Sequence, residues 1–238
     1  MHRFVWDLHY VPPKALEYEF PISAILHNTP LLPLGAWALP GSYTVKLTVD
    51  GQTFTQPLIV KMDPRIQRSP DDLRKQQEME LGAVKGMNES YETLEQVKSA
   101  RAQIKELTPK ATSKKHLDKD LADVDQKCAE LEGATQRSFY GVPSKGKQPE
   151  NFSTLNQHFS AILAVADSAD AAPTTQATAA YQELEQSAAA LSLHWSELRE
   201  REIPALNKNL KAAGLTPIDP QKPLERELGG ASEGDDEP

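Results

Sequence analysis

Few residues in this sequence have a type and spacing that could do chemistry. Asp7 and His9, together with His27 further along, combine carboxylate and imidazole groups that could hold a metal ion or exchange protons. They fall in a strand-like run and in a proline-rich stretch, and nothing in the pattern brings them together. We therefore interpret them first as ordinary structural or solvated side chains, with a metal or acid–base cluster as the minor alternative.

The other histidines fit no known catalytic pattern. His116, His158 and His194 each fall on a different predicted helix. A di-metal site in a helical bundle needs Glu-x-x-His motifs, and the sequence contains none. It also has no His-Glu-x-x-His, phosphate-binding glycine loop or dinucleotide fingerprint. The sequence predicts no catalytic, cofactor-binding or metal-binding residue.

The remaining reactive or recognition side chains have simpler explanations. Trp6 and Trp37 could form a sugar-stacking surface, but tryptophans near a small sheet more often belong to a core. Cys128, the single cysteine, is in phase with neighbouring leucines, which predicts a small buried apolar residue rather than a reactive thiol. The pair Asp71 and Asp72 is explained by capping of a helix start.

Composition narrows the class of protein. The chain has 34 acidic and 26 basic residues, a net charge of −8, and no evident cluster of Lys or Arg, which disfavours nucleic acid as a partner. No apolar run approaches the roughly 20 residues of a membrane span. The first residues lack the basic, apolar and small-residue pattern of a secretory signal, so nothing in the sequence as given directs export.

Residues 1–63 have a β pattern. Residues 4–6 begin a strand-like run, and 42–49 and 52–61 flank Asp50-Gly51, a dipeptide typical of type I′ hairpin turns. Prolines exclude a helix between 11 and 40, which leaves a long loop with short strand pieces such as 22–26. So few strands form a thin core. We expect a partial antiparallel β-sandwich, truncated at its front, in which Phe4 and Trp6 lie in a core or at an open edge.

Residues 64–215 have a helical pattern. The predicted helices run over 70–107, 113–131, 153–167 and 174–214. Ser69 caps the first, Thr108-Pro109 ends it, and Ser153 caps the third. Short connections between amphipathic helices predict an up-down four-helix bundle, and hence an α+β fold that is mainly α.

The fourth predicted helix has the longest uninterrupted pattern. Its apolar residues recur every three or four positions and predict one buried stripe, at Tyr181, Leu184, Ala188, Leu191, Trp195 and Leu198. Pro204 predicts a kink or break near 200–203. In the first helix, Gly82 and Gly86 allow close approach of a neighbour. Residues 216–238 are rich in Pro, Gly and acidic residues and predict a disordered tail.

Several segments resemble known proteins. The runs RFVWDL at 3–8 and LPGSYTVKLTVDG at 39–51 resemble the second half of an immunoglobulin-like module of the kind found in the flagellar hook-capping protein. Together with QPLIVKMDPR at 56–65 and LNKNLKAAGL at 206–215, they resemble the C-terminal region of bacterial sortilin-like, BNR-repeat β-propeller proteins, often labelled glycosyl-hydrolase-like. In that family a propeller precedes the module and the bundle, and the proteins are generally exported. The resemblance therefore implies a periplasmic or extracellular location and no catalytic residue in this region.

Three hypotheses for function follow. The leading one is a non-catalytic accessory or interaction module from the C-terminus of a propeller-type exported protein. Its partner would be an upstream propeller or a chain that completes the sandwich near Phe4 and Trp6. The alternatives are the scaffold portion of a glycosyl-hydrolase-like or peptidase-like hydrolase whose active site lies elsewhere, and a free-standing helical adaptor that binds through its fourth helix.

Overall fold

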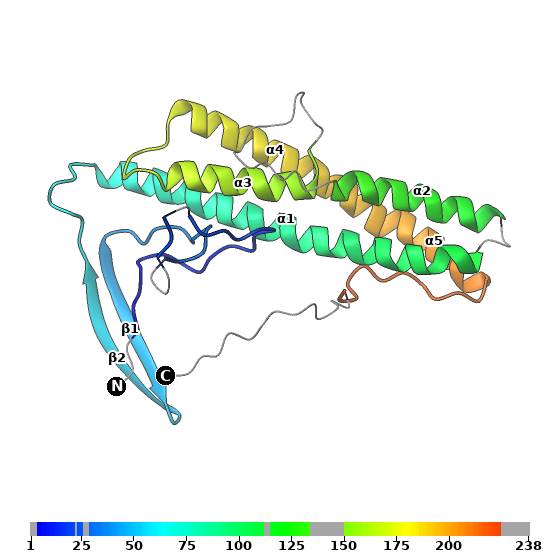
Figure 1. The fold of residues 1–238 in the computed structure, drawn as a ribbon, viewed down its shortest axis with the longest axis horizontal. Helices are drawn as coiled ribbons and strands as arrows, with labels where there is room; N and C mark the ends of the chain where they lie inside the picture. The colour runs from blue at the N-terminus through cyan, green and yellow to red at the C-terminus, as the bar shows by residue number, and fades with distance from the viewer. Residues whose placement is uncertain (1–3, 22, 26–28, 112–114, 134–149, 225–238) are drawn as a thin grey trace. The chain divides into compact units, whose positions relative to one another are not determined.

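The computed structural model describes residues 4–21, 23–25, 29–111, 115–133 and 150–224. It is mainly helical with one small antiparallel sheet, as the sequence predicts (Figure 1). The chain divides into two compact units, one of residues 1–91 and 134–191 and the other of 92–133 and 192–238. Each unit is described by itself.

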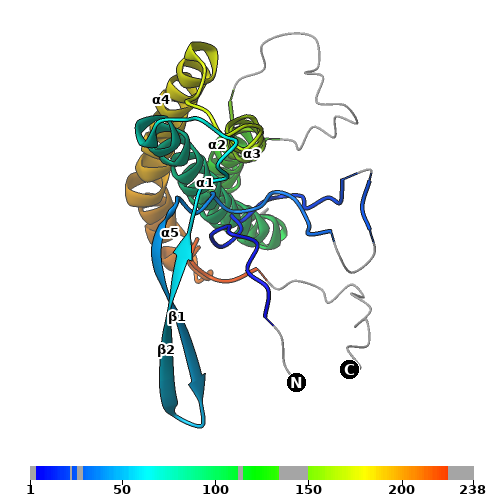
Figure 2. The ribbon, with the colours of Figure 1, turned by 90° about the vertical axis from the view of Figure 1, so that its left-hand side faces the viewer.

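The hairpin of the first unit consists of β1 (Gly41–Val49) and β2 (Gln52–Val60), as the sequence predicts. Leu47 lies opposite Phe54, and Tyr43 lies opposite Leu58. Asp50 and Gly51 have φ angles of 49° and 78°, the positive values that a type I′ turn needs. Both strands are visible as a twisted ribbon (Figure 2).

Residues 4–10 are less regular than predicted, whereas the described residues of 11–39 form the predicted irregular stretch. The expected strand at 4–6 is not formed, and Phe4 is 89% exposed rather than part of a core. The only pairing along this segment in the described residues is two isolated bridges, His9 with Trp37 and Glu19 with Leu32. The strand at 4–6 is missing because no neighbouring strand in the described part of the chain pairs with it, whereas the predicted loop between 11 and 40 is confirmed, since each of its prolines lacks the N–H that a continuous ladder requires. The predicted piece at 22–26 falls partly outside the described residues.

The long helix α1 (Pro70–Ala111) begins as predicted and ends later. Asp72 N–H donates to Ser69 Oγ at 3.1 Å, and Ser69 N–H donates to Asp72 Oδ2 at 3.4 Å, which forms a capping box. The predicted end at Leu107 is wrong, because the helix continues through Pro109. A proline in the last turn removes only one backbone hydrogen bond, so a helix that has already formed tolerates it there.

In the first unit, α3 (Phe152–Ala166) and the start of α4 (Thr175–Glu197) approach α1 at its two glycines. A methyl group at Gly86 would lie 2.5 Å from the ring of Phe159, and one at Gly82 would lie 2.1 Å from Tyr181 Oη. The predicted close approach is confirmed. The predicted cap of α3 is wrong by two residues, since Asn151 rather than Ser153 accepts the Thr154 N–H, at 2.9 Å.

The second unit contains α2 (Lys115–Glu132) and α5 (Ile203–Ala212). A π-helical turn at Leu198–Glu202 leads into α5, so the predicted interruption before Pro204 is confirmed. The buried stripe predicted for the fourth helix is confirmed in part: Leu184, Trp195 and Leu198 are buried, and Tyr181, Ala188 and Leu191 are half-buried.

The tail of the chain is more ordered at its start than predicted. Ile218 is 3% exposed, and the Asn207 amide bonds both backbone groups of Ile218, at 2.7 and 2.8 Å. Composition predicts disorder from the average properties of a segment, so it does not reveal a single isoleucine that is buried and hydrogen-bonded by an asparagine. The prediction is therefore wrong for 216–224, and residues 225–238 lie outside the described part.

Candidate functional site

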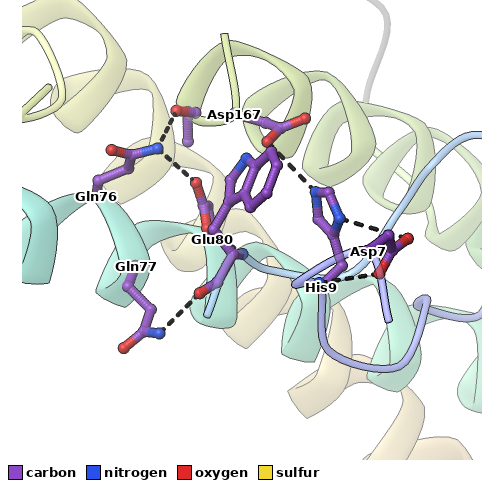
Figure 3. Close-up of polar contacts among 8 residues, drawn as sticks. Asp7, His9, Gln76, Gln77, Glu80 and Asp167 are labelled. Carbon is purple, nitrogen blue, oxygen red and sulfur yellow. Dashed lines mark hydrogen bonds and ion pairs between the residues drawn. The ribbon is translucent and has the colours of Figure 1, made fainter. Parts of the chain in front are cut away.

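A buried polar cluster joins α1 to the N-terminal segment in the first unit (Figure 3). Its centre is Glu80, whose side chain is fully buried. Glu80 Oε2 accepts the Trp37 N–H at 2.9 Å, and Glu80 Oε1 accepts Gln76 Nε2 at 2.9 Å. Gln77 Nε2 donates to the Trp37 carbonyl at 2.8 Å. One turn of α1 therefore fixes both backbone groups of Trp37.

Gln76 extends this cluster to the end of α3. Its Nε2 also donates to the Ala166 carbonyl at 3.1 Å, and its Oε1 accepts the Ala171 N–H at 3.2 Å. The side chain thus satisfies backbone groups at the C-terminus of α3, where carbonyls lack helical partners. Gln76 and Glu80 are four residues apart, so they lie on the same face of α1.

His9 lies on the other side of Trp37, between two carboxylates. Its side chain is 6% exposed, with Nδ1 at 3.5 Å from Asp7 Oδ2 and Nε2 at 3.9 Å from Asp167 Oδ1. Neither ring nitrogen makes a hydrogen bond, and the ring centroid is 3.8 Å from that of Trp37. Asp7 Oδ1 accepts the His9 N–H at 3.0 Å, and the His9 carbonyl accepts Trp6 Nε1 at 2.8 Å.

The pKa of Glu80 is raised above its ordinary value of 4.5. The main cause is burial, which disfavours the charged carboxylate, and the nearby Asp167 and Asp170 act in the same direction. The two hydrogen bonds from Trp37 and Gln76 act in the opposite direction and are outweighed. The charged form of Glu80 is thus less favourable than that of a solvated glutamate, as is common for carboxyl groups in acid–base sites.

The surroundings of Glu80 favour a structural role for the cluster. Glu80 borders a cavity of about 230 Å³, whose other walls include Leu39, Met62 and Leu73. No serine, threonine or cysteine nucleophile lines this cavity. With Glu80 fully buried and bonded to two donors, the arrangement is suited to hold the N-terminal segment on α1 rather than to transfer protons to a substrate.

A second polar residue, Asn156 on α3, fastens the same segment. Its Oδ1 accepts the Leu16 N–H at 3.0 Å, and its Nδ2 donates to the carbonyls of Lys14 and Met87 at 3.0 and 2.9 Å. Asn156 is 1% exposed. One side chain therefore joins three segments of the first unit.

One face of the hairpin is an exposed apolar surface, which we call the hairpin face. It consists of Val45, Leu47, Val49, Phe54 and Leu58, which alternation places on one side of the two strands. They are 51%, 58%, 47%, 56% and 37% exposed, respectively. The opposite face is more polar, with Thr48 and Thr53 hydroxyls 3.2 Å apart. Since the described sheet has only β1 and β2, the outer edge of each strand is also unpaired there.

The residues singled out from the sequence have different outcomes. Asp7 and His9 do lie together, whereas His27 is outside the described residues. The side chains of His116, His158 and His194 are exposed, as predicted for solvated histidines.

The two tryptophans and the cysteine lie in packed surroundings. Trp37 stacks on His9, and Trp6 packs edge-on against Tyr43, with ring centroids 5.3 Å apart. Both tryptophans are half-buried, so their rings pack on protein groups, but neither lies in the buried core, where the sequence predicts them. Cys128 is fully buried, and desolvation raises the pKa of its thiol to about 12, so its predicted burial is confirmed.

Sequence reasoning missed Glu80, Gln76, Asp167 and Asn156. A signal for two of them exists, because Gln76 and Glu80 are in phase with Ala83 and Met87 on the buried stripe of α1. A polar residue at such a position predicts a buried hydrogen bond. Asp167 and Asn156 are recognised only once α3 is placed beside the N-terminal segment.

No family model, curated protein or solved structure matches this chain. Within the described residues, no group of three His, Cys, Asp or Glu side chains could hold a metal ion. None of the described helices is both long enough and apolar enough to span a membrane.

Proposed function

We propose that this chain is a non-catalytic interaction module whose hairpin face docks on an apolar β-sheet surface of a partner. The observation that carries the proposal is the exposure of Leu47, Phe54 and three further apolar side chains on one face of two strands. A solvated two-stranded hairpin is marginally stable by itself, whereas a covering sheet would bury these side chains.

The chemistry of the hairpin face defines the partner. The five side chains carry no charge, and the polar positions opposite and beside them on that face are Gln52 and Gln56. A complementary surface is therefore apolar and uncharged, like the inner face of a β-sandwich. Each free strand edge also offers N–H and C=O groups that a further strand can pair with.

Two finer features belong to this proposal. We infer that residues 1–63 represent part of an immunoglobulin-like sandwich whose opposing sheet comes from another segment or chain. We also infer that the helices of 64–215 form one four-helix bundle that carries the hairpin. The resemblance to the C-terminal region of exported sortilin-like propeller proteins makes a propeller the leading candidate for the partner.

Photocrosslinking from the two faces tests the proposal. A benzophenone amino acid is introduced at Leu47 on the hairpin face or at Lys46 on the opposite face, in the full chain expressed in its source cells. We expect Leu47 to give one dominant crosslinked product, mapped to a β-strand of the partner, and Lys46 to give little. Equal products from the two positions, or none from either, would refute the proposal.

A charge placed in the interface provides the matched control. Phe54→Lys should abolish the crosslink from Leu47. Burying an unpaired ammonium group costs several kcal/mol, which is enough to prevent docking of the partner. Thr55→Lys places the same charge one residue away on the opposite face. It should leave the crosslink intact.

A further inference from the structure

A second surface of the first unit is a groove between α3 and the N-terminal segment, which we call the α3 groove. Its volume is about 710 Å³. Glu19, Phe20 and Leu32 line one wall, and Gln157, Ala161 and Asp167 line the other. It shares no lining residue with the hairpin face.

Most ionisable side chains of the α3 groove are acidic. Three carboxylates, those of Glu17, Glu19 and Asp167, line it, no Lys or Arg is among its lining residues, and the lining His158 pairs with Glu150 at 3.1 Å. Asp167 Oδ1 faces His9 Nε2 at 3.9 Å, and a third of the Asp167 side chain remains exposed. Three carboxylates along one groove, with Glu17 and Glu19 exposed, attract a cationic group through an interaction that salt screens.

The groove also exposes apolar side chains. Phe20 is 60% exposed and Leu32 is 42% exposed, at positions where the chain is extended and joined by the bridge of Glu19 with Leu32. Across from them, α3 presents the small residues Ala161 and Ala164, which leave room for a ligand. Apolar contact surface and negative charge therefore occur in the same groove.

We propose that the α3 groove binds an extended peptide segment of a partner protein in which basic and apolar residues alternate. Its apolar side chains would pack on Phe20, Leu32 and Ala161, and its Lys or Arg side chains would pair with Glu19 and Asp167. Charge complementarity selects a basic peptide over an acidic or neutral one. This site is independent of the hairpin face, so either proposal can fail without the other.

Fluorescence anisotropy with a labelled peptide of sequence Ala-Leu-Arg-Leu-Lys-Leu-Ala tests the inference on the full chain. We expect saturable binding that weakens with added salt, as an exposed charge pairing does. A peptide with Glu in place of Arg and Lys, and one with Ser in place of Leu, should each bind roughly tenfold more weakly, about the effect of losing one to two kcal/mol of contacts. Equal binding of all three peptides would overturn the proposal.

Matched variants locate the binding. Ala161→Trp fills the groove, whereas Val165→Trp adds the same side chain at an exposed position of α3 that does not line it. Glu19→Gln removes a groove charge, and Glu78→Gln removes an exposed charge on α1 that does not line the groove. The first variant of each pair should weaken binding about threefold or more, as expected for loss of one exposed pair or contact, and the second should leave it unchanged.

Two further outcomes would contradict the proposal. Loss of peptide binding on Phe54→Lys would mean that the peptide had bound the hairpin face. Complete displacement of the peptide by spermidine at equal concentration would mean that the groove reads only positive charge. The first result would place the binding site outside the α3 groove. The second would show that apolar residues of the peptide do not contribute to binding.

Discussion

Replacement of Gly86 by alanine tests how closely α3 packs on α1. The added methyl group would lie 2.5 Å from two atoms of the Phe159 ring and 2.7 Å from a third. Phe159 is 2% exposed, so the ring cannot move into solvent. Overpacking of a core in this way typically costs about 1–3 kcal/mol. The alanine gains roughly 1 kcal/mol of helix propensity. We expect Gly86→Ala to lower the free energy of unfolding by about 1 kcal/mol, within the range that these two effects allow.

Gly82→Ala is the matched control. It gains the same helix propensity, but its methyl group meets Tyr181 Oη, at 2.1 Å, rather than the middle of a buried ring. The Tyr181 side chain is half-buried, and its hydroxyl donates to the exposed Glu185 carboxylate at 2.9 Å. The ring can therefore rotate outward, and the variant should stay within about 0.5 kcal/mol of wild type, since the gain and the lost contacts offset each other.

Urea denaturation followed by circular dichroism measures both variants. The difference between them isolates the overpacking, because the propensity gains cancel. A second test is Phe159→Leu in the Gly86→Ala background, where a smaller side chain should recover part of the loss as a favourable coupling. Equal effects of the two glycine replacements, or no coupling with Phe159→Leu, would refute the packing described for α1 and α3.

Three further predictions concern buried polar groups. Because the pKa of Glu80 is raised, the folded chain retains a proton that the unfolded chain loses above pH 4.5. The free energy of unfolding should therefore fall as pH rises from 4.5 through the raised pKa. Denaturation of Glu80→Gln across pH 4.5–7 should show a weaker dependence of this free energy on pH. Asn156→Ala should cost about 2–4 kcal/mol through three lost hydrogen bonds and speed tryptic cleavage after Lys14, whereas unchanged cleavage would contradict the fastening role. Cys128, with a pKa near 12 and no exposed surface, should react with a thiol reagent only in urea, and fast reaction of the native chain would contradict its burial.

Much of the fold could be predicted because its signals are local. Asp50-Gly51 specifies the hairpin turn, Ser69 and Asp72 specify the start of α1, and the periodic stripe places Leu184 on a buried face. Each of these depends on residues a few positions apart. The predicted strand at Phe4 failed because strand formation needs a partner, which no local pattern supplies.

The candidate site was much less predictable. Asp7 and His9 were recognised, but their neighbour Asp167 comes from the far end of α3, and Glu80 reaches them through Trp37. These contacts join positions that are distant in sequence, so no spacing rule identifies them. The exposure of the hairpin face was equally hidden, because alternation predicts which side chains share a face and not whether that face is covered.

The most direct test of the central claim is the accessibility of the hairpin face in the native setting. Leu47→Cys and Thr48→Cys place one thiol on each face of β1, and the buried Cys128 does not compete for a maleimide reagent. In the purified chain both new thiols should react quickly, since both positions are exposed. In source cells we predict that the thiol at 47 reacts roughly tenfold more slowly while the thiol at 48 is unchanged, because a docked partner excludes water and reagent from one face. Equal reactivity at the two positions in cells would contradict a partner on the hairpin face.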